Sequence, residues 1–338
     1  MNKWYEKSGK DGDVVISTRI RLARNINGFP FPARLNSEQK ARVEEQIKNA
    51  VLNSNSYISS DFKFLPLENL GADEAASMVE RHLVSPEFIS DLQGRGIIIN
   101  GDESISIMVN EEDHVRIQVM KEGFDLSAAF ETADRIDTLM GENLSIAYSP
   151  QLGYLTQCPT NLGTGMRASV MLHLPALQDS GALPRITATL SKLGIVMRGT
   201  YGEGSGVVGS MYQLSNQITL GLSEQEAVNN LTTITNQLIA EERKAREAMV
   251  RNLTVQDKIS RAMGVLKSAR LMSFSEYMGL ISLVRFGVST NLINGITNDE
   301  INALTVRVQP ATIGSNMETA ERDVKRAEII RSVFENVL

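Results

Sequence analysis

Three short segments in which apolar and polar residues alternate follow one another without any helical spacing between them. They are residues 96–100, 104–110 and 115–120, and the turn-like Asn100-Gly101-Asp102 separates the first two. Parallel strands need long crossover connections, whereas antiparallel strands can follow one another directly. This succession predicts an antiparallel sheet. Three later segments are candidate strands of the same sheet: residues 144–149, 169–174 and 207–214.

Helical spacing of apolar side chains appears in four segments that begin with polar residues or lie between the strands. These predicted helices are residues 37–53, 73–82, 127–141 and 183–192. They interrupt runs of strands and do not alternate regularly with them. The predicted fold class is therefore α+β, an antiparallel β-sheet flanked by helices.

Capping boxes of the form S/T-x-x-E mark the beginnings of later helices. They begin at Ser223, Ser273 and Thr297, and the first opens a glycine-free stretch that ends in a highly charged run. This stretch predicts a long exposed helix. No convincing alternation follows, so we expect an α+β domain over residues 1–250 and an all-helical C-terminal domain over residues 251–338.

Composition limits the class of protein. A chain of 338 residues exceeds the roughly 250–300 residues at which single hydrophobic cores stop growing, so two domains are expected. A net charge of −6 argues against nucleic acid as a partner, because a phosphate backbone demands a basic face. The single cysteine, Cys158, fits a reducing compartment. The polar start and the lack of a run of about 20 apolar residues predict a cytoplasmic protein without signal peptide or membrane span.

The common glycine-rich phosphate loops are largely missing. No P-loop of the form G-x-x-x-x-G-K-[ST] occurs in the sequence. One G-x-G-x-x-G match, formed by Gly204, Gly206 and Gly209, lies among strands expected to be antiparallel, which is not the context of a dinucleotide fold. We interpret these glycines as a flexible loop near a ligand, with an ordinary turn as the alternative.

Arginines on strands and beside turns are the more unusual feature. Arg19 and Arg21 alternate along one predicted strand, so they share one of its faces. Arg116 follows an acidic run, Arg167 follows a glycine-containing loop, and Arg198 opens another. A single arginine of this kind usually forms a surface ion pair. Five of them indicate a clamp for a polyphosphate, because guanidinium groups bind phosphate bidentately and stay charged.

Four segments resemble the signature blocks of the phosphagen kinases, the ATP:guanido phosphotransferases. They are residues 17–21, 110–116, 158–168 and 198–200, in the family's order. The resemblance implies a guanido kinase or glutamine synthetase-like catalytic domain that binds ATP with Mg²⁺ and holds no tightly bound metal of its own. By position it implies that the following residues bind the nucleotide: Ser17, Thr18, Arg19, Ile20, Arg21, His82, Arg116, Arg167, Ala168, Ser169, Val170, Met171, Arg198, Gly199, Thr200, Tyr201, Gly202 and Glu203. Without the family, His82 would be interpreted as a helix-end histidine.

Glu112 and Glu203 match the family's carboxylates that grip the guanidinium acceptor. A guanidinium is protonated at neutral pH, so its nitrogen has no free lone pair for attack on phosphorus. Carboxylates can fork onto the planar cation, and one of them can accept its proton during transfer. Without the family, the acidic run around Glu112 would be interpreted as a solvated loop. Cys158 matches the family's reactive cysteine, whose thiolate lies near the guanidinium, and would otherwise be interpreted as a small buried hydrophobe.

The order of the domains resembles that of bacterial protein arginine kinases, which phosphorylate arginine side chains within proteins. Creatine and free-arginine kinases carry a helical domain before the first arginine block, whereas here Arg19 comes early and the helical region follows. Residues 322–327 also fit the R-D-x-x-R-A motif, which in that family forms an allosteric phosphoarginine pocket. The residues implied are Arg322, Asp323, Arg326 and Ala327. The two arginines are four apart, so on a helix they share a face and can fork onto one phosphate. By pattern alone, this is a charged helix face.

The same resemblance implies a homodimer formed through the helical domain and protein substrates that bear arginine. It implies a role in stress response and protein quality control through the Clp protease system, with an activator protein and a heat-shock repressor as partners. Direct contact with nucleic acid or membrane is not expected, from the charge and the lack of a long apolar run. Two alternatives remain. One is a small-molecule arginine kinase that stores phosphate as free phosphoarginine, and the other is a catalytically silent adaptor that binds phosphoarginine. The presence of both glutamates, the cysteine and all five arginines favours an active kinase.

Overall fold

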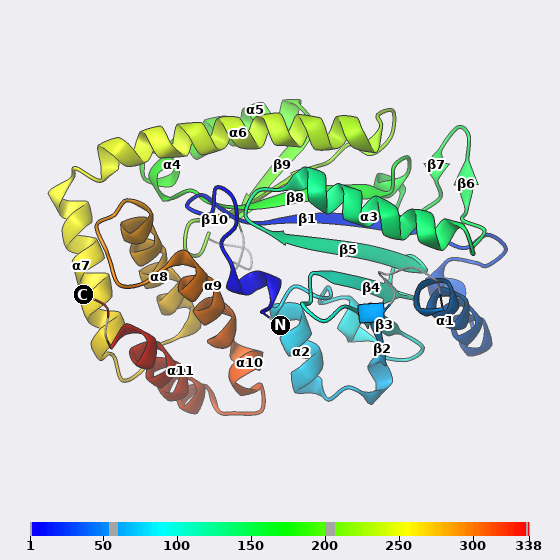
Figure 1. The fold of residues 1–338 in the computed structure, drawn as a ribbon, viewed down its shortest axis with the longest axis horizontal. Coiled ribbons are helices and arrows are strands. Elements are labelled where there is room, and N and C mark those ends of the chain that lie inside the picture. Colours follow the sequence, from blue (N-terminus) through cyan, green and yellow to red (C-terminus); the bar gives the residue numbers. More distant parts are fainter. Residues whose placement is uncertain (1, 54–59, 200–206, 336, 338) are drawn as a thin grey trace.

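The computed structural model describes residues 2–53, 60–199, 207–335 and 337. Eight strands form one antiparallel sheet in the order β2-β3-β4-β5-β1-β8-β10-β9 (Figure 1). This confirms the antiparallel sheet predicted from the run of short strands. The strands are β1 Val15–Arg24, β2 Lys63–Pro66, β3 Gly96–Ile99, β4 Ile105–Val109, β5 Val115–Glu122, β8 Met166–His173, β9 Ile195–Gly199 and β10 Met211–Asn216.

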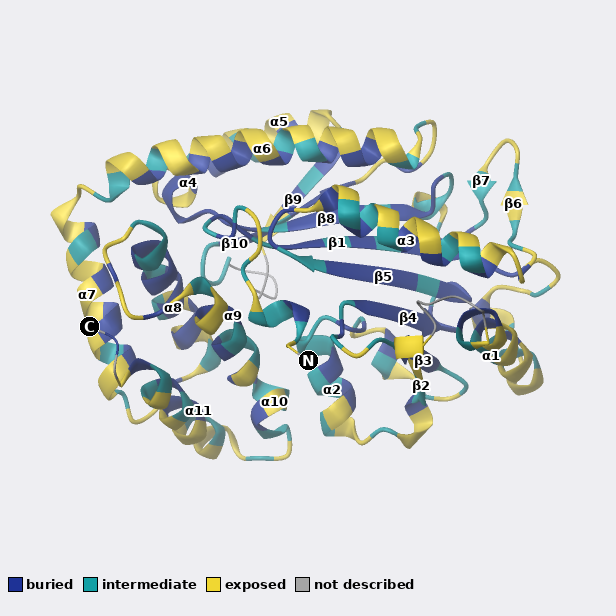
Figure 2. Cartoon of the chain, in the orientation of Figure 1, coloured by how far each residue is buried: buried dark blue, intermediate teal, exposed yellow. Residues whose placement is uncertain are grey.

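Alternation along the strands gives the sheet two chemically different faces. On one face the side chains of Ile20, Ile117 and Val170 are fully buried. Helices α1, α3 and α6 pack on this side and form the main hydrophobic core with it (Figures 1 and 2). The other face is covered by α2 over β3 and β4, where a smaller apolar cluster lies. The helices of this part are α1 Ser37–Leu52, α2 Ala72–Glu80, α3 Leu126–Gly141, α4 Pro175–Asp179, α5 Leu183–Lys192 and α6 Glu224–Met249.

Helices α7–α11 form a second lobe beside the sheet, with a hydrophobic core of their own. We call this part the helical lobe. Its all-helical character agrees with the prediction for the C-terminal region. Within the described ranges, no helix is both long and apolar enough to cross a membrane. The helices are α7 Leu253–Ser268, α8 Phe274–Ser289, α9 Asn298–Arg307, α10 Pro310–Gly314 and α11 Thr319–Phe334.

Capping residues predicted from the sequence mark the starts of α6, α8 and α9. The hydroxyls of Ser223, Ser273 and Thr297 accept hydrogen bonds from backbone N–H groups three residues later, and these residues cap α6, α8 and α9. One strand prediction was wrong, and another placed the start of a strand too early. Of residues 144–149, only Tyr148–Ser149 is a strand (β6), and it pairs with Gly153–Tyr154 (β7) in a separate sheet, because the turn at residues 150–152 folds the next segment back onto it. The strand expected from residue 207 begins at Met211, since left-handed backbone at Gly209 and Ser210 cannot extend it.

An ion pair buried in α6 joins the sheet to the helices around it. Arg246 Nε lies 2.7 Å from Glu242 Oε1, and both side chains are almost completely buried. Glu242 accepts hydrogen bonds from the first backbone N–H groups of α4, at Ala176 and Leu177. Arg246 donates to the carbonyl oxygen of His173 and lies over the ring of Phe286 in α8. Removing one partner would therefore leave the other charge buried without a counter-charge.

We predict that Arg246→Met lowers the free energy of unfolding by roughly 3–5 kcal/mol, because Glu242 is left buried and uncompensated. Urea unfolding followed by circular dichroism measures this change. Arg261→Met is the matched control, since Arg261 forms the same i,i+4 pair with Asp257 on the exposed face of α7. Its urea midpoint should stay at the wild-type value. Equal midpoints for the two variants would contradict the structural role of the buried pair.

Candidate active site

Five arginines lie on the sheet face that α3 and α6 do not cover. Arg19 and Arg21 are two residues apart on β1, and Arg21 lies directly opposite Arg167 of β8. Arg116 of β5 lies opposite Ala23, which is two residues after Arg21 on β1 and faces the same side. Arg198 of β9 pairs with Gln213 of β10, whose side chain reaches Arg19. Strand register therefore places guanidinium groups from four strands on one surface.

The alternation also narrows the set of residues that line this surface. Thr18, Ile20, Ala168 and Val170 are completely buried on the opposite side of the sheet. The hydroxyl of Thr18 donates to the carbonyl oxygen of Gly123, and the other three belong to the main core. These four side chains do not reach the arginine face. Only every second side chain of the two sequence blocks therefore faces this surface, and nucleotide binding by the blocks stays a prediction.

The arginines repel one another, and few anions offset them. Burial, together with Arg167 and Arg116, lowers the pKa of Arg19 to about 10. The charge of Arg19, with burial, holds the pKa of Arg21 well below its ordinary value. Burial and Arg198 lower the pKa of Arg167 as well. Among the described residues, the buried Nε of Arg21 has no hydrogen-bond acceptor. A surface with these properties favours a polyanion.

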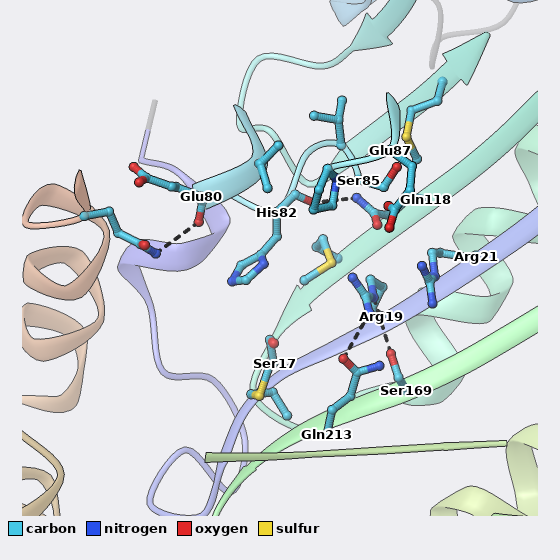
Figure 3. A pocket seen from close by; sticks show the side chains of 17 residues that line it. Ser17, Arg19, Arg21, Glu80, His82, Ser85, Glu87, Gln118, Ser169 and Gln213 are labelled. Atoms are coloured by element: carbon cyan, nitrogen blue, oxygen red, sulfur yellow. Dashed lines mark hydrogen bonds between the residues drawn. The ribbon is translucent and has the colours of Figure 1, made fainter. Parts of the chain in front are cut away.

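Hollows along this face meet at Arg21. The first, of about 450 Å³, is lined by Ser17, Arg19, His82, Ser169 and Met171 among others (Figure 3). The second runs along Arg167, Arg198 and Gly199. The third, of about 240 Å³, contains Glu112, Cys158 and Arg116. Arg21 lines all three, so they form one groove that runs across the strands.

His82 points into the first hollow from the end of α2 (Figure 3). Burial and the neighbouring charge of Arg19 lower its pKa to about 4, so the imidazole is neutral at physiological pH. The carbonyl oxygen of His82 accepts a hydrogen bond of 2.6 Å from Gln118 of β5. The sheet thus holds this histidine in place by its backbone.

At the other end of the groove, Arg116 contacts two neighbouring glutamates. Its Nη1 lies 2.6 Å from Glu111 and its Nη2 lies 2.9 Å from Glu112. Glu111 is buried and also accepts a hydrogen bond from the hydroxyl of Ser85. Glu112 keeps 37% of its side chain exposed. Burial raises the pKa of Glu112 above its ordinary value, although Arg116 opposes this shift.

The third acid of this run, Asp113, links the glutamates to the cysteine. Its Oδ1 accepts hydrogen bonds from the Asn25 side chain at 2.6 Å and from the backbone N–H of Gln157 at 2.8 Å. Gln157 precedes Cys158, whose sulfur lies 3.1 Å from the hydroxyl of Thr160. Asp113 is fully buried. It therefore positions the cysteine segment beside Glu112 without facing the groove.

Several predicted site residues lie outside the described part of the chain. They are Thr200, Tyr201, Gly202 and Glu203, together with Gly204 and Gly206 of the glycine pattern. Arg198 and Gly199 precede this segment and line the groove. The second predicted carboxylate therefore stays a prediction.

Sequence comparison identifies the family. Residues 42–245 match the family described as "ATP:guanido phosphotransferase, C-terminal catalytic domain", and residues 252–338 match "Protein-arginine kinase McsB C-terminal domain". The protein-arginine kinase of Clostridium acetobutylicum is 43% identical, covering 98% of this chain and 99% of its own length. That of Moorella thermoacetica is 43% identical over 98% of this chain and 97% of its own. The chain belongs to the protein-arginine kinase family of ATP:guanido phosphotransferases.

Solved guanido kinases share the fold of this family member. A lombricine kinase structure superposes with a TM-score of 0.61 at 29% identity, covering 70% of this chain and 68% of its own. The duplicated taurocyamine kinase from Schistosoma mansoni, with bound transition state analog components, also gives a TM-score of 0.61 at 29% identity. That match covers 79% of this chain and 38% of the kinase.

The R-D-x-x-R-A residues of this guanido phosphotransferase lie on α11 of the helical lobe, outside the groove. Arg326 is buried, and it donates to the carbonyl oxygens of Val308 and Met272, both at 2.8 Å. It also pairs with Asp323. Arg322 bonds to Thr319 of its own helix. Ala327 belongs to the lobe's core. The two arginines do not fork toward one point here, because Arg326 finds backbone acceptors inside the lobe.

Sequence reasoning missed several polar residues of the groove. Gln118, Gln213 and Ser85 line the first hollow, and Glu111 neutralises Arg116. A signal existed for Gln118, because it stands two residues after Arg116 on a predicted strand and so shares its face. Ser85 and Gln213 come from segments whose approach to the arginines depends on tertiary packing. No local pattern would have identified them.

We predict that Arg21→Met weakens ADP binding by at least about tenfold, since the loss of a charge-assisted phosphate contact costs roughly 1.5–3 kcal/mol. The melting temperature without nucleotide should stay equal or rise, because one mutually repelling cation is gone. Isothermal titration and differential scanning calorimetry measure the two quantities. Arg42→Met is the control, since Arg42 pairs with Glu38 on the exposed face of α1. Unchanged ADP affinity in Arg21→Met would contradict the assignment of this face.

Proposed function

We propose that this protein transfers the γ-phosphoryl group of ATP to arginine side chains of proteins, producing phosphoarginine. The observation that carries the proposal is the groove itself. A row of guanidinium groups connects a hollow beside the neutral His82 with a hollow that holds Glu112 and Cys158. One end suits a nucleotide and the other suits a planar cation, with the phosphate-binding charges between them.

The nucleotide would lie with its base and ribose in the first hollow and its phosphates along the arginines. Neutral His82 adds no charge there, while Ser17, Ser169 and Gln213 offer polar atoms. The unpaired Nε of Arg21 would bond a phosphate oxygen. Within the described ranges, no three His, Cys, Asp or Glu side chains gather to hold a metal. From the family likeness, magnesium would enter with the triphosphate, as is common for this cation.

The acceptor guanidinium would lie in the third hollow, against Glu112 and Cys158. Glu112 is exposed enough to be reached, and its raised pKa suits a group that accepts a proton during transfer. The acceptor nitrogen would form a bond to the γ-phosphorus as the bond to the ADP oxygen breaks. The proton lost by that nitrogen would pass to a carboxylate, either Glu112 or the predicted partner Glu203.

A polypeptide acceptor is supported by the relatives, which are named protein-arginine kinases, and by the space around Glu112. A further hollow of about 650 Å³ shares Glu112 and Arg116 with the acceptor end of the groove. It extends past Lys40, Asp91 and Arg95 to the outside. Residues that flank a target arginine would fit there, whereas a free amino acid would leave this space empty.

Regulation and assembly follow from the family likeness and are part of the proposal. Residues 1–250 would form the catalytic domain, and residues 251–338 would support dimerisation and phosphoarginine binding at Arg322 and Arg326. The protein would act in the cytoplasm during stress, with an activator protein, a heat-shock repressor and the Clp protease system as partners. Phosphate binding would require Arg326 to leave its carbonyl partners.

The direct test offers ATP with either free arginine or an arginine-rich unfolded protein. We predict acid-labile phosphoarginine on the protein, detected by mass spectrometry under neutral conditions. Glu112→Gln should lower kcat/KM by about 10²–10⁴, the usual contribution of a general base. Glu131→Gln, on the exposed face of α3, should not change it. Product from free arginine alone would indicate a metabolite kinase, and absence of ATP turnover would indicate a silent adaptor.

The pH profile tests the environment of Glu112. Because its pKa is raised, the ionised form is lost as pH falls through a value above that of an ordinary glutamate. We predict an acidic limb in kcat/KM, with activity falling about tenfold per pH unit below that pKa. Glu111 contributes to the rise, so Glu111→Gln should move the limb to lower pH. A limb that stays in place or moves to higher pH would contradict this assignment.

A further inference from the structure

The end of α2 fixes the direction in which His82 points. The backbone N–H of His82 bonds to the carbonyl oxygen of Val79, and that of Leu83 bonds to Met78. His82 itself has a φ of +61°. These features form a Schellman ending, in which the residue after the helix takes the left-handed conformation. Non-glycine residues adopt this conformation at a cost, so His82 keeps it only while α2 stays in place.

The helical lobe holds this end of α2 through Glu80. Oε1 of Glu80 accepts a hydrogen bond of 2.6 Å from the backbone N–H of Ala311. Oε2 accepts from the backbone N–H of Thr312 at 2.7 Å and from its hydroxyl at 2.9 Å. These donors belong to the first turn of α10, more than two hundred positions later in the sequence. The carboxylate of Glu80, at the end of α2, thus caps a helix of the helical lobe.

We call the contact between Glu80 and the start of α10 the clasp. Gln309, which precedes α10, belongs to both the clasp and the groove. It lines the first hollow together with His82 and Glu80. Its side-chain amide donates to the carbonyl oxygen of Glu80 at 3.3 Å, and the side chain is buried. Behind it, Arg326 bonds to the carbonyl oxygen of Val308, the preceding residue. Figure 3 shows Glu80 and His82 on the same wall of the hollow, opposite Arg19.

We propose that the clasp between Glu80 and the start of α10 is a positioning device for the nucleotide site. The helical lobe would complete the first hollow through Gln309 and keep His82 aimed into it. This inference rests on the proposed function, because it takes the first hollow as the nucleoside site. Its consequence is specific: loosening the clasp weakens nucleotide binding and leaves the acceptor end, on the far side of Arg21, unaffected.

The test compares two glutamates of one helix. Glu80→Gln removes the charge that accepts three hydrogen bonds, whereas Glu74→Gln makes the same change on the exposed side of α2. For Glu80→Gln we expect the KM for ATP and the Kd for MgADP to rise roughly two- to thirtyfold, the range that loss of a helix cap corresponds to. The kcat and the KM for the protein acceptor should change by less than about twofold. Glu74→Gln should match the wild type in all four quantities.

A second variant approaches the clasp from the helical lobe. Thr312→Val keeps the side-chain shape and removes one of the donors to Glu80. It should raise the Kd for MgADP about two- to fivefold. This effect is smaller than that of Glu80→Gln, because the two backbone N–H donors to Glu80 remain and only one hydrogen bond is lost. In the double variant with Glu80→Gln, the Kd for MgADP should rise by less than the product of the two single increases, because both substitutions act on one contact.

The outcomes separate the inference from the function on which it rests. An active wild type whose Kd for MgADP is unchanged by Glu80→Gln overturns the positioning device and leaves the kinase assignment standing. Equal losses in kcat, acceptor KM and melting temperature also overturn it, since they indicate a purely structural contact. A wild type that neither binds MgADP nor transfers phosphate contradicts the proposed function and the inference together.

Discussion

The groove depends on keeping guanidinium groups of like charge close together on one face of a sheet. Neighbouring arginine charges and burial together lower the pKa values of Arg19, Arg21 and Arg167, so their assembly is unfavourable on its own. The strand register prevents their separation, and the opposite face of the same strands packs the main core with α3 and α6. Burial of Ile20 and Val170 thus stabilises a backbone whose alternate side chains repel. A polyphosphate would relieve that repulsion, and this supports the proposal that a nucleotide binds along the row.

Three consecutive acids next to Arg116 have three different roles because each meets a different environment. Glu111 is buried and neutralises Arg116, and Asp113 is buried and holds the cysteine segment. Glu112 stays partly exposed with a raised pKa, as the proposed role of binding an incoming cation and taking its proton requires. The arginine row lies between the hollow beside His82 and these carboxylates, so opposite charges adjoin within one groove. Transfer between them needs mainly positioning and fixed electrostatics, as expected for phosphoryl transfer.

Local patterns in the sequence were enough for the parts of the fold that local interactions determine. Capped helices at Ser223 and Thr297 and the antiparallel run from β3 to β5 were predicted from neighbouring residues alone. That Arg19 and Arg21 share one face of a strand followed from alternation, and the resemblance to the family blocks suggested the carboxylates. What could not be predicted depends on partners far along the chain. Arg326 turned inward to the carbonyl oxygens of Val308 and Met272, and Glu80 found its donors on α10. Such contacts are set by how the lobes pack, and no spacing in the sequence reports them.

The central claim is that one groove holds a nucleotide along the arginine row and a guanidinium against Glu112. A crystal structure with MgADP, nitrate and an arginine-containing peptide tests it most directly, because planar nitrate can occupy the place of the transferring phosphoryl group. The account predicts the adenosine beside His82, the ADP phosphates on Arg21 and Arg167, and the peptide guanidinium within hydrogen-bond distance of Glu112. A nucleotide bound elsewhere, or a peptide arginine remote from Glu112, would contradict it.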